Sequence, residues 1–148
     1  MAKSLRERLV ETALEWQKKY GVAPSITTTV SEYDAAGLVG MPDEKYVEQG
    51  KTRTAVSKGF DFIFAGNRYQ VKANRPSGKP GSKVTLVGKA KNYEWDYLIW
   101  ILYYKSYEIK EAWIWEVAQY RKQFNHQNRL SPVDMRHGKF LDINQKLC

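Results

Sequence analysis

Residues 59–74 constrain the fold of this chain most strongly, because they alternate as a β-hairpin requires. Every second position from Phe60 to Phe64 is phenylalanine, and the alternation resumes in residues 69–73. A period of two indicates a strand. Gly66-Asn67 stands between the two runs and supplies the positive φ of a two-residue hairpin turn. The sequence therefore predicts two antiparallel strands joined at Gly66-Asn67.

The polar residues of this hairpin form an unusual set. Gln70 and Lys72 are two positions apart, so they share one face of the second strand. Asp61 stands at the start of the first strand, which brings a carboxylate, an amide oxygen and an ammonium to one sheet edge. A metal-dependent phosphodiesterase needs such groups. A half-exposed hairpin with polar residues in water explains the pattern as well, and the alternation alone does not decide between the two.

Asp61 followed by Gln70-Val71-Lys72 resembles the signature of the PD-(D/E)XK nuclease superfamily. Glutamine in place of the usual acid is similar to the variant of the Mrr-like branch. Many members also carry a glutamate on the helix before the hairpin, and Glu32 matches that position. The resemblance covers roughly residues 31–115. It implies an α/β fold: a single restriction-endonuclease-like domain with a central mixed β-sheet flanked by helices.

The resemblance also implies a chemistry, that of a Mg-dependent endodeoxyribonuclease that hydrolyses phosphodiester bonds of nucleic acid, with DNA as the expected substrate. Mg²⁺ (or Mn²⁺) would be held by Asp61, Gln70, the Val71 carbonyl and Glu32, and Lys72 would orient the attacking water or neutralise the transition state. Glutamine is a weaker ligand than glutamate, so we expect modest metal affinity.

The charge distribution points to a polyanionic partner. The chain carries a formal net charge of +8, and residues 62–93 contain no acid but several lysines and arginines. A field of one sign beside the candidate site attracts nucleic acid, although a solvated basic face is the simpler alternative. The expected nucleic-acid contacts are Lys58, Arg75, Lys79, Lys83 and Lys89.

The N-terminal third predicts two helices. Residues 4–20 form an amphipathic pattern that begins with a Ser4–Glu7 capping box and ends at Gly21. Ser31 is predicted to cap a second helix over residues 32–39, which puts Glu32 in its first turn, where the helix dipole favours a carboxylate. Residues 43–58 lack a clear period and are predicted to be a loop, and residues 83–87 are a candidate short strand.

Residues 95–104 are almost wholly apolar and aromatic, as in a buried central strand, though a buried helix has the same composition. Residues 111–117 are its predicted hairpin partner. Residues 116–124 predict a helix, and Ser131 with Pro132 predicts the start of a last short one. The whole chain, residues 1–148, is thus predicted to be one domain with a basic helical tail over residues 116–148.

Several function classes find no support. The one cysteine, Cys148, allows no intrachain disulfide, which fits a reducing cytoplasm. No apolar run of about 18 residues predicts a membrane span. His126 and His137 are eleven positions apart, which is not metal-ligand spacing, and neither a Ser-His-Asp set nor a phosphate-binding glycine loop is recognisable.

Two rival interpretations remain open. One is a nucleic-acid-binding module on the same fold that does not cut, since Gln70 replaces an acid. The other is a small subunit of a larger complex, whose aromatic strands form an interface. Aromatic residues in strands usually fill the core, but a homodimer through these strands is an alternative use.

Overall fold

A five-stranded mixed sheet forms the centre of the computed structural model, which describes residues 2–52, 59–77 and 79–143. The strands lie in the order of the chain: β1 (Phe62–Phe64), β2 (Asn67–Asn74), β3 (Tyr97–Tyr103), β4 (Ile109–Glu116) and β5 (Lys139–Leu141). Strands β2 and β3 are parallel, and the other neighbours are antiparallel. The predicted α/β class with a central mixed sheet and flanking helices is confirmed.

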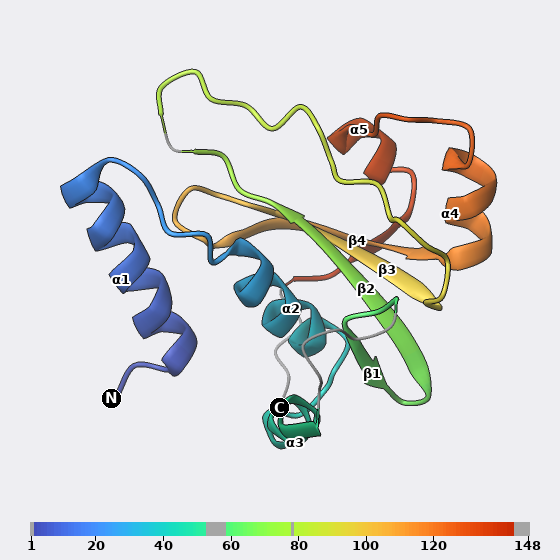
Figure 1. Cartoon of the computed structure of the whole chain (residues 1–148), viewed down its shortest axis with the longest axis horizontal. Helices are drawn as coiled ribbons and strands as arrows, with labels where there is room; N and C mark the ends of the chain where they lie inside the picture. The colour runs from blue at the N-terminus through green and yellow to red at the C-terminus, as the bar shows by residue number, and fades with distance from the viewer. Residues whose placement is uncertain (1, 53–58, 78, 144–148) are drawn as a thin grey trace.

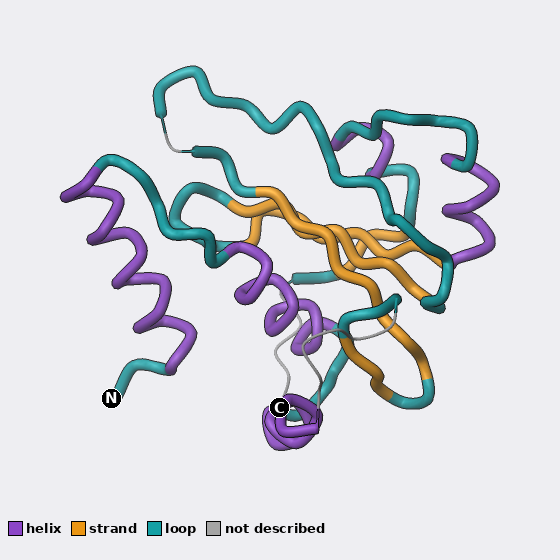
Figure 2. The backbone as a smooth tube through the Cα atoms, in the orientation of Figure 1, coloured by secondary structure: helices purple, strands orange, loops and turns teal. Residues whose placement is uncertain are grey.

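Helices cover both faces of the sheet (Figure 1). On one side lie α1 (Leu5–Tyr20), α2 (Thr27–Leu38) and α3 (Asp43–Thr52), and on the other lie α4 (Val117–Phe124) and α5 (Pro132–Met135). The connection between β2 and β3 crosses the second side as a long loop (Figure 2). Strand β3 is buried on both faces, since Ile99 and Ile101 face one cluster and Leu98 and Trp100 the other. This explains its nearly unbroken apolar run.

The hairpin turn lies one position earlier than predicted. Ala65 and Gly66 both have positive φ, at 52° and 80°, and Phe64 pairs with Asn67. A two-residue turn of this type needs positive φ at both central positions, which a short alanine side chain tolerates here. This register puts Phe62 opposite Tyr69 in the core, whereas a slip of one residue would move the core side chains of one strand to the opposite face of the sheet.

Helix α1 forms as predicted and is tied to the domain by a polar network. The Ser4 hydroxyl accepts a hydrogen bond from the Glu7 amide, and Gly21 ends the helix at φ 86°. The Arg6 guanidinium pairs with both carboxylate oxygens of Asp34, at 2.7 and 2.8 Å. The Tyr103 hydroxyl donates to Asp34 at 2.6 Å from the central strand. The network therefore joins α1, α2 and the sheet.

The prediction for the second helix was wrong about its start. Helix α2 begins at Thr27, so Ser31 is interior and buried, and its hydroxyl donates to the Thr28 carbonyl at 3.0 Å. Packing of Val30 and Ala35 in the core outweighs the weak helix propensity of the threonines. Glu32 consequently lies in the middle of the helix and not in its first turn.

Two further segments differ from expectation. The predicted loop over residues 43–58 contains a helix, α3, whose exposed surface lacks the apolar stripe that marks a buried helix, and residues 53–58 of the prediction lie outside the described residues. Residues 83–87 form no strand and make only an isolated bridge between Val87 and Leu130. Short strand β5 was not predicted, because Lys139 and Phe140 are exposed and leave no alternation to detect.

Three C-terminal elements are confirmed. Strand β4, helix α4 and helix α5 follow one another as expected, and Ser131 forms a capping box with Asp134 ahead of Pro132. The predicted helical tail over residues 116–148 was wrong about β5, and residues 144–148 lie outside the described residues. Of the helices that the structure describes, none has the length and apolar character needed to cross a membrane.

Candidate functional site

The site lies immediately before the start of strand β1. The Asp61 amide still donates to the Tyr69 carbonyl at 2.7 Å, as a strand residue would. Val71 lies two positions after Tyr69 in β2, and its amide donates to Oδ2 of the Asp61 side chain at 2.7 Å. A carboxylate thus replaces the backbone of a neighbouring strand, and its position is fixed by the sheet.

The carbonyl of Val71 opens to the same edge. In a strand, the N–H and the C=O of one residue face the same neighbouring strand. The Val71 carbonyl therefore points to the side of β2 where Asp61 lies, just before β1 begins. The second carboxylate oxygen of Asp61, Oδ1, accepts no hydrogen bond from the residues that the structure describes. Asp61 Oδ1 and the Val71 carbonyl therefore lie on the same side of β2.

Lys72 and Gln70 lie on one face of β2. Lys72 is half-buried, and its stem passes beneath Gly88, where an added Cβ would lie 3.8 Å from the Lys72 Cδ. Burial lowers the pKa of the Lys72 ammonium below its usual value; Asp61 opposes this shift and Lys91 adds to it. The structure therefore brings Asp61 and Lys72 close enough to interact electrostatically. Half-buried Gln70 lies two positions before Lys72, on the same face of β2.

Gly59 holds the segment that leads into Asp61. It has φ +72°, and an added Cβ would lie 2.7 Å from the Cβ of Glu94. Both the backbone conformation and the close approach require glycine. The chain therefore enters β1 along a fixed path, which sets where the Asp61 carboxylate reaches β2.

Glu32 lies in the helical layer that covers the Val71 face of the sheet. It is half-buried on α2, on the same helical face as Ala35 and Ala36, which pack in the core beneath β2 and β1. This face is the one from which a side chain can extend toward the sheet. A ligand role for Glu32 remains a prediction.

The donor set fits a hard cation with few protein ligands. Within the described residues, no three histidine, cysteine, aspartate or glutamate side chains gather as metal ligands. The predicted set does not need three, because it combines the carboxylates of Asp61 and Glu32 with an amide oxygen and a main-chain carbonyl. Mg²⁺ takes such oxygen ligands and retains several waters. Gln70 and Lys72 alternate with Val71, so they lie on the opposite face of the sheet from α2, and the structure does not bring Gln70 and Glu32 together. The groups that fit Mg²⁺ or Mn²⁺ at the Asp61–Val71 edge are the Asp61 carboxylate and the Val71 carbonyl.

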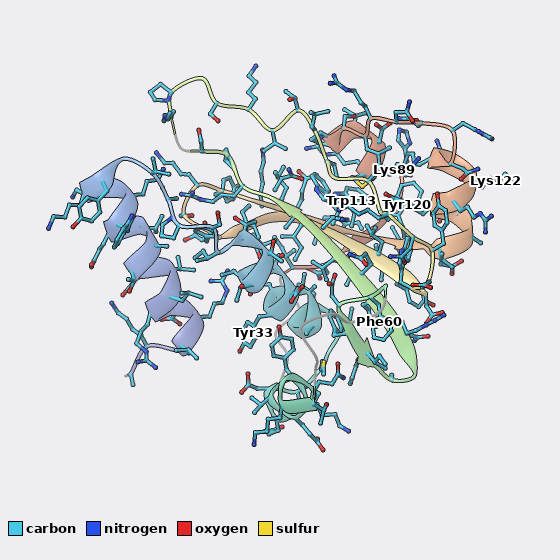
Figure 3. All side chains as sticks on the ribbon, viewed as in Figure 1. Tyr33, Phe60, Lys89, Trp113, Tyr120 and Lys122 are labelled. Atoms are coloured by element: carbon cyan, nitrogen blue, oxygen red, sulfur yellow. The ribbon has the colours of Figure 1, made fainter. Side chains whose placement is uncertain are left out.

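Two of the five predicted nucleic-acid contacts also serve the fold. Arg75 donates to the Lys105 carbonyl at 2.9 and 2.6 Å and to Gln17 Oε1 at 2.9 Å. Lys89 donates to the Gln127 carbonyl at 2.8 Å, and it lies with Tyr120 beside α4, away from Phe60 and the start of β1 (Figure 3). Replacing either residue would disturb packing as well as any phosphate contact.

The other three differ in their surroundings. Lys79 and Lys83 are exposed on the connection between β2 and β3 and make no ion pair with a described residue. Lys58 lies outside the described residues. Sequence reasoning did not select Gly59 or Lys91 for the site, although each stands next to a segment that it did select. Their roles depend on the approach of residues 88–94, which no local pattern reveals.

A scan against protein-family models finds no matching family, and a search of curated proteins finds no match. The resemblance to the PD-(D/E)XK superfamily therefore rests on Asp61, Gln70, Val71, Lys72 and Glu32 themselves.

Proposed function

We propose that this protein is a metal-dependent nuclease that hydrolyses phosphodiester bonds, with DNA as its expected substrate. One observation carries the proposal. The Asp61 carboxylate accepts from the Val71 amide, and the Val71 carbonyl lies on the same side of β2, beside a half-buried Lys72 that the Asp61 charge reaches. A carboxylate, a main-chain carbonyl and a desolvated ammonium together serve phosphoryl chemistry better than they serve stability.

Each residue has a distinct role in the proposed reaction. Asp61 Oδ1 and the Val71 carbonyl would hold Mg²⁺ or Mn²⁺, and Gln70 or Glu32, which come from opposite faces of the sheet, would complete the set directly or through water. When bound, such an ion supplies Lewis acidity and a water of lowered pKa. Lys72 would orient the attacking water and stabilise the charge that develops on the phosphoryl oxygens. Its burial beneath Gly88 keeps the ammonium in one place.

A second candidate function is nucleic-acid binding without cleavage. Gln70 favours it, since a neutral amide holds a divalent cation less firmly than a carboxylate would. In that case the basic surface would retain its role, and Asp61 would serve chiefly as the hydrogen-bond partner of Val71.

Cleavage of DNA and RNA substrates, each with Mg²⁺, with Mn²⁺ and with a chelator, tests the proposal. We expect wild-type protein to cut with metal and not with chelator, and Asp61→Asn to lose cutting while it still binds nucleic acid. A wild-type protein that binds but never cuts, on varied substrates, supports the second candidate and rejects the nuclease.

A further inference from the structure

A wide groove lies at the end of β3, on the same sheet face as Lys72. It has a volume of 1110 Å³, and its walls come from the connection after β2, the turn between β3 and β4, and helix α5. Leu102 and Val84 in its lining belong to the core cluster on the Lys72 face. We call it the basic groove, after the lysines in its walls: Lys79, Lys83, Lys105 and Lys110.

The basic groove carries unneutralised positive charge. In the described part of the chain, none of its four lysines forms an ion pair. Arg136, also in the lining, is neutralised by Glu111 at 2.5 Å. Glu108 is the one acid among the lining residues. Four exposed ammonium groups against one carboxylate create a field that favours an anionic ligand.

The turn that carries Lys105 is held rigidly. Arg75 donates to the Lys105 carbonyl and stacks on the Tyr107 ring at 4.4 Å. Arg6 donates to the Tyr107 carbonyl at 2.8 Å from the opposite side. Tyr107 is buried with φ 67°, a conformation that persists only where the surroundings enforce it. The groove is thus built before a ligand arrives, which limits the entropy that binding would cost.

We propose that the basic groove binds the phosphate backbone of nucleic acid a few nucleotides from the candidate cleavage site. The identity of the ligand rests on the proposed function, because the Asp61 site on the same face takes phosphodiesters. The spacing is suitable. Lys72 and Pro76 at the groove wall are four positions apart, which in extended chain spans at most on the order of 13 Å. That span corresponds to about four base steps along one strand of a duplex.

Salt titrations of binding test the proposal, with chelator present so that nothing is cut. The test variant is K105Q/K110Q. The matched control is K18Q/K19Q, which removes the same charge from the exposed end of α1. Binding of labelled duplex and single-stranded oligonucleotides would be followed by fluorescence anisotropy. Each lysine that contacts a phosphate contributes about one unit to the slope of log K against log salt.

We expect K105Q/K110Q to weaken binding and to reduce that slope by about two, while K18Q/K19Q keeps the wild-type slope. A loss confined to one oligonucleotide form still supports the groove and identifies the form it holds. Equal slopes for the two variants overturn the proposal. So does a protein that binds anionic phosphatidylserine vesicles through Lys105 and Lys110 but binds neither oligonucleotide.

Cleavage assays on the same samples separate this inference from the proposed function. Metal-dependent cutting by wild type, with equal slopes for both variants, rejects the groove and retains the nuclease. A reduced slope for K105Q/K110Q, without cutting by wild type, retains the groove and rejects the nuclease.

Discussion

The Asp61 carboxylate accepts a hydrogen bond from the Val71 amide just before strand β1 begins, with 2.7 Å between Oδ2 and the Val71 nitrogen. One oxygen of the carboxylate is thereby committed to the fold, and the other accepts no hydrogen bond from the described residues. Asp61 therefore has a structural role, the hydrogen bond to Val71, and a proposed chemical role as a metal ligand. Substitutions of Asp61 are needed to separate these two roles.

Asp61→Asn and Asp61→Ala should separate them. The asparagine retains a side-chain oxygen for the Val71 amide, whereas alanine leaves that part-buried amide without its partner. We expect Asp61→Ala to lower the free energy of unfolding by about 1–2 kcal/mol, and Asp61→Asn to lower it by a smaller amount. Urea unfolding measures both. Equal stability of Asp61→Ala and wild type would show that the Val71 hydrogen bond contributes nothing.

Substitution of Lys72 should stabilise the protein. Its pKa is lowered chiefly by burial, so the unfolded chain binds more protons between the folded pKa and the ordinary value of 10.5. Stability therefore rises with pH through that window, and at neutral pH the buried charge is a cost. We expect Lys72→Met to raise the midpoint of thermal unfolding by about 2 °C, which corresponds to about 0.5 kcal/mol after screening by solvent.

Lys91→Met provides the matched control for Lys72. Lys91 is exposed and lowers the Lys72 pKa through repulsion, so its removal should stabilise less and raise the Lys72 pKa. Thermal scans at neutral and alkaline pH test both variants. A Lys72→Met midpoint below that of wild type at neutral pH would mean that attraction to Asp61 outweighs burial.

The hairpin and the central strand could be predicted from sequence because their patterns are local. Phe62 and Phe64 reflect burial on one face of β1, and the apolar run before Tyr103 reflects burial on both faces of β3. Phe60 lies before β1 and packs against the other cluster, so the alternation did not extend to it. The same alternation placed Gln70 and Lys72 on one face. The association of Asp61 with Lys72 followed from the family resemblance and from the hairpin register together.

The missed features depend on contacts between distant segments. Ser31 was predicted to be a cap, since serine favours that position, but packing of α2 on the sheet extended the helix through the threonines before it. Gly88, in the long connection between β2 and β3, covers the stem of Lys72. No repeating sequence pattern predicts this contact. Lys105 belongs to a groove only because Arg75 and Arg6 hold its turn.

Gly138 should tolerate no side chain. An added Cβ would lie 2.5 Å from Trp115 Nε1 and 2.8 Å from its Cδ1. Trp115 is buried and donates to the Met135 carbonyl at 3.0 Å, so it cannot move aside without losing that hydrogen bond. We expect Gly138→Ala to lower the free energy of unfolding by about 1–3 kcal/mol.

Gly50→Ala is the counterpart for Gly138. Gly50 lies in helix α3 with nothing within 4 Å of an added Cβ. Alanine there should stabilise by about 0.5–1 kcal/mol, because the unfolded chain loses freedom and the helix gains propensity. Denaturant unfolding of the two variants should give opposite signs. A stabilising Gly138→Ala would show that the Trp115 pocket has more room than the structure gives it.

Gln70→Glu decides between the nuclease and the binding module. Gln70 shares a strand face with Lys72, and a carboxylate there would add a charged oxygen ligand beside Asp61. If Gln70 faces the metal, Gln70→Glu should bind Mg²⁺ or Mn²⁺ about tenfold more tightly, a gain of about 1.4 kcal/mol. Gln119→Glu makes the same change of charge on the exposed surface of α4 and should leave metal affinity as it is. Calorimetric titration with each metal, without nucleic acid, measures the affinity independently of activity. Equal affinities for the two variants, with no gain in cutting by Gln70→Glu, would remove Gln70 from the metal site and leave nucleic-acid binding as the function that the basic surface supports.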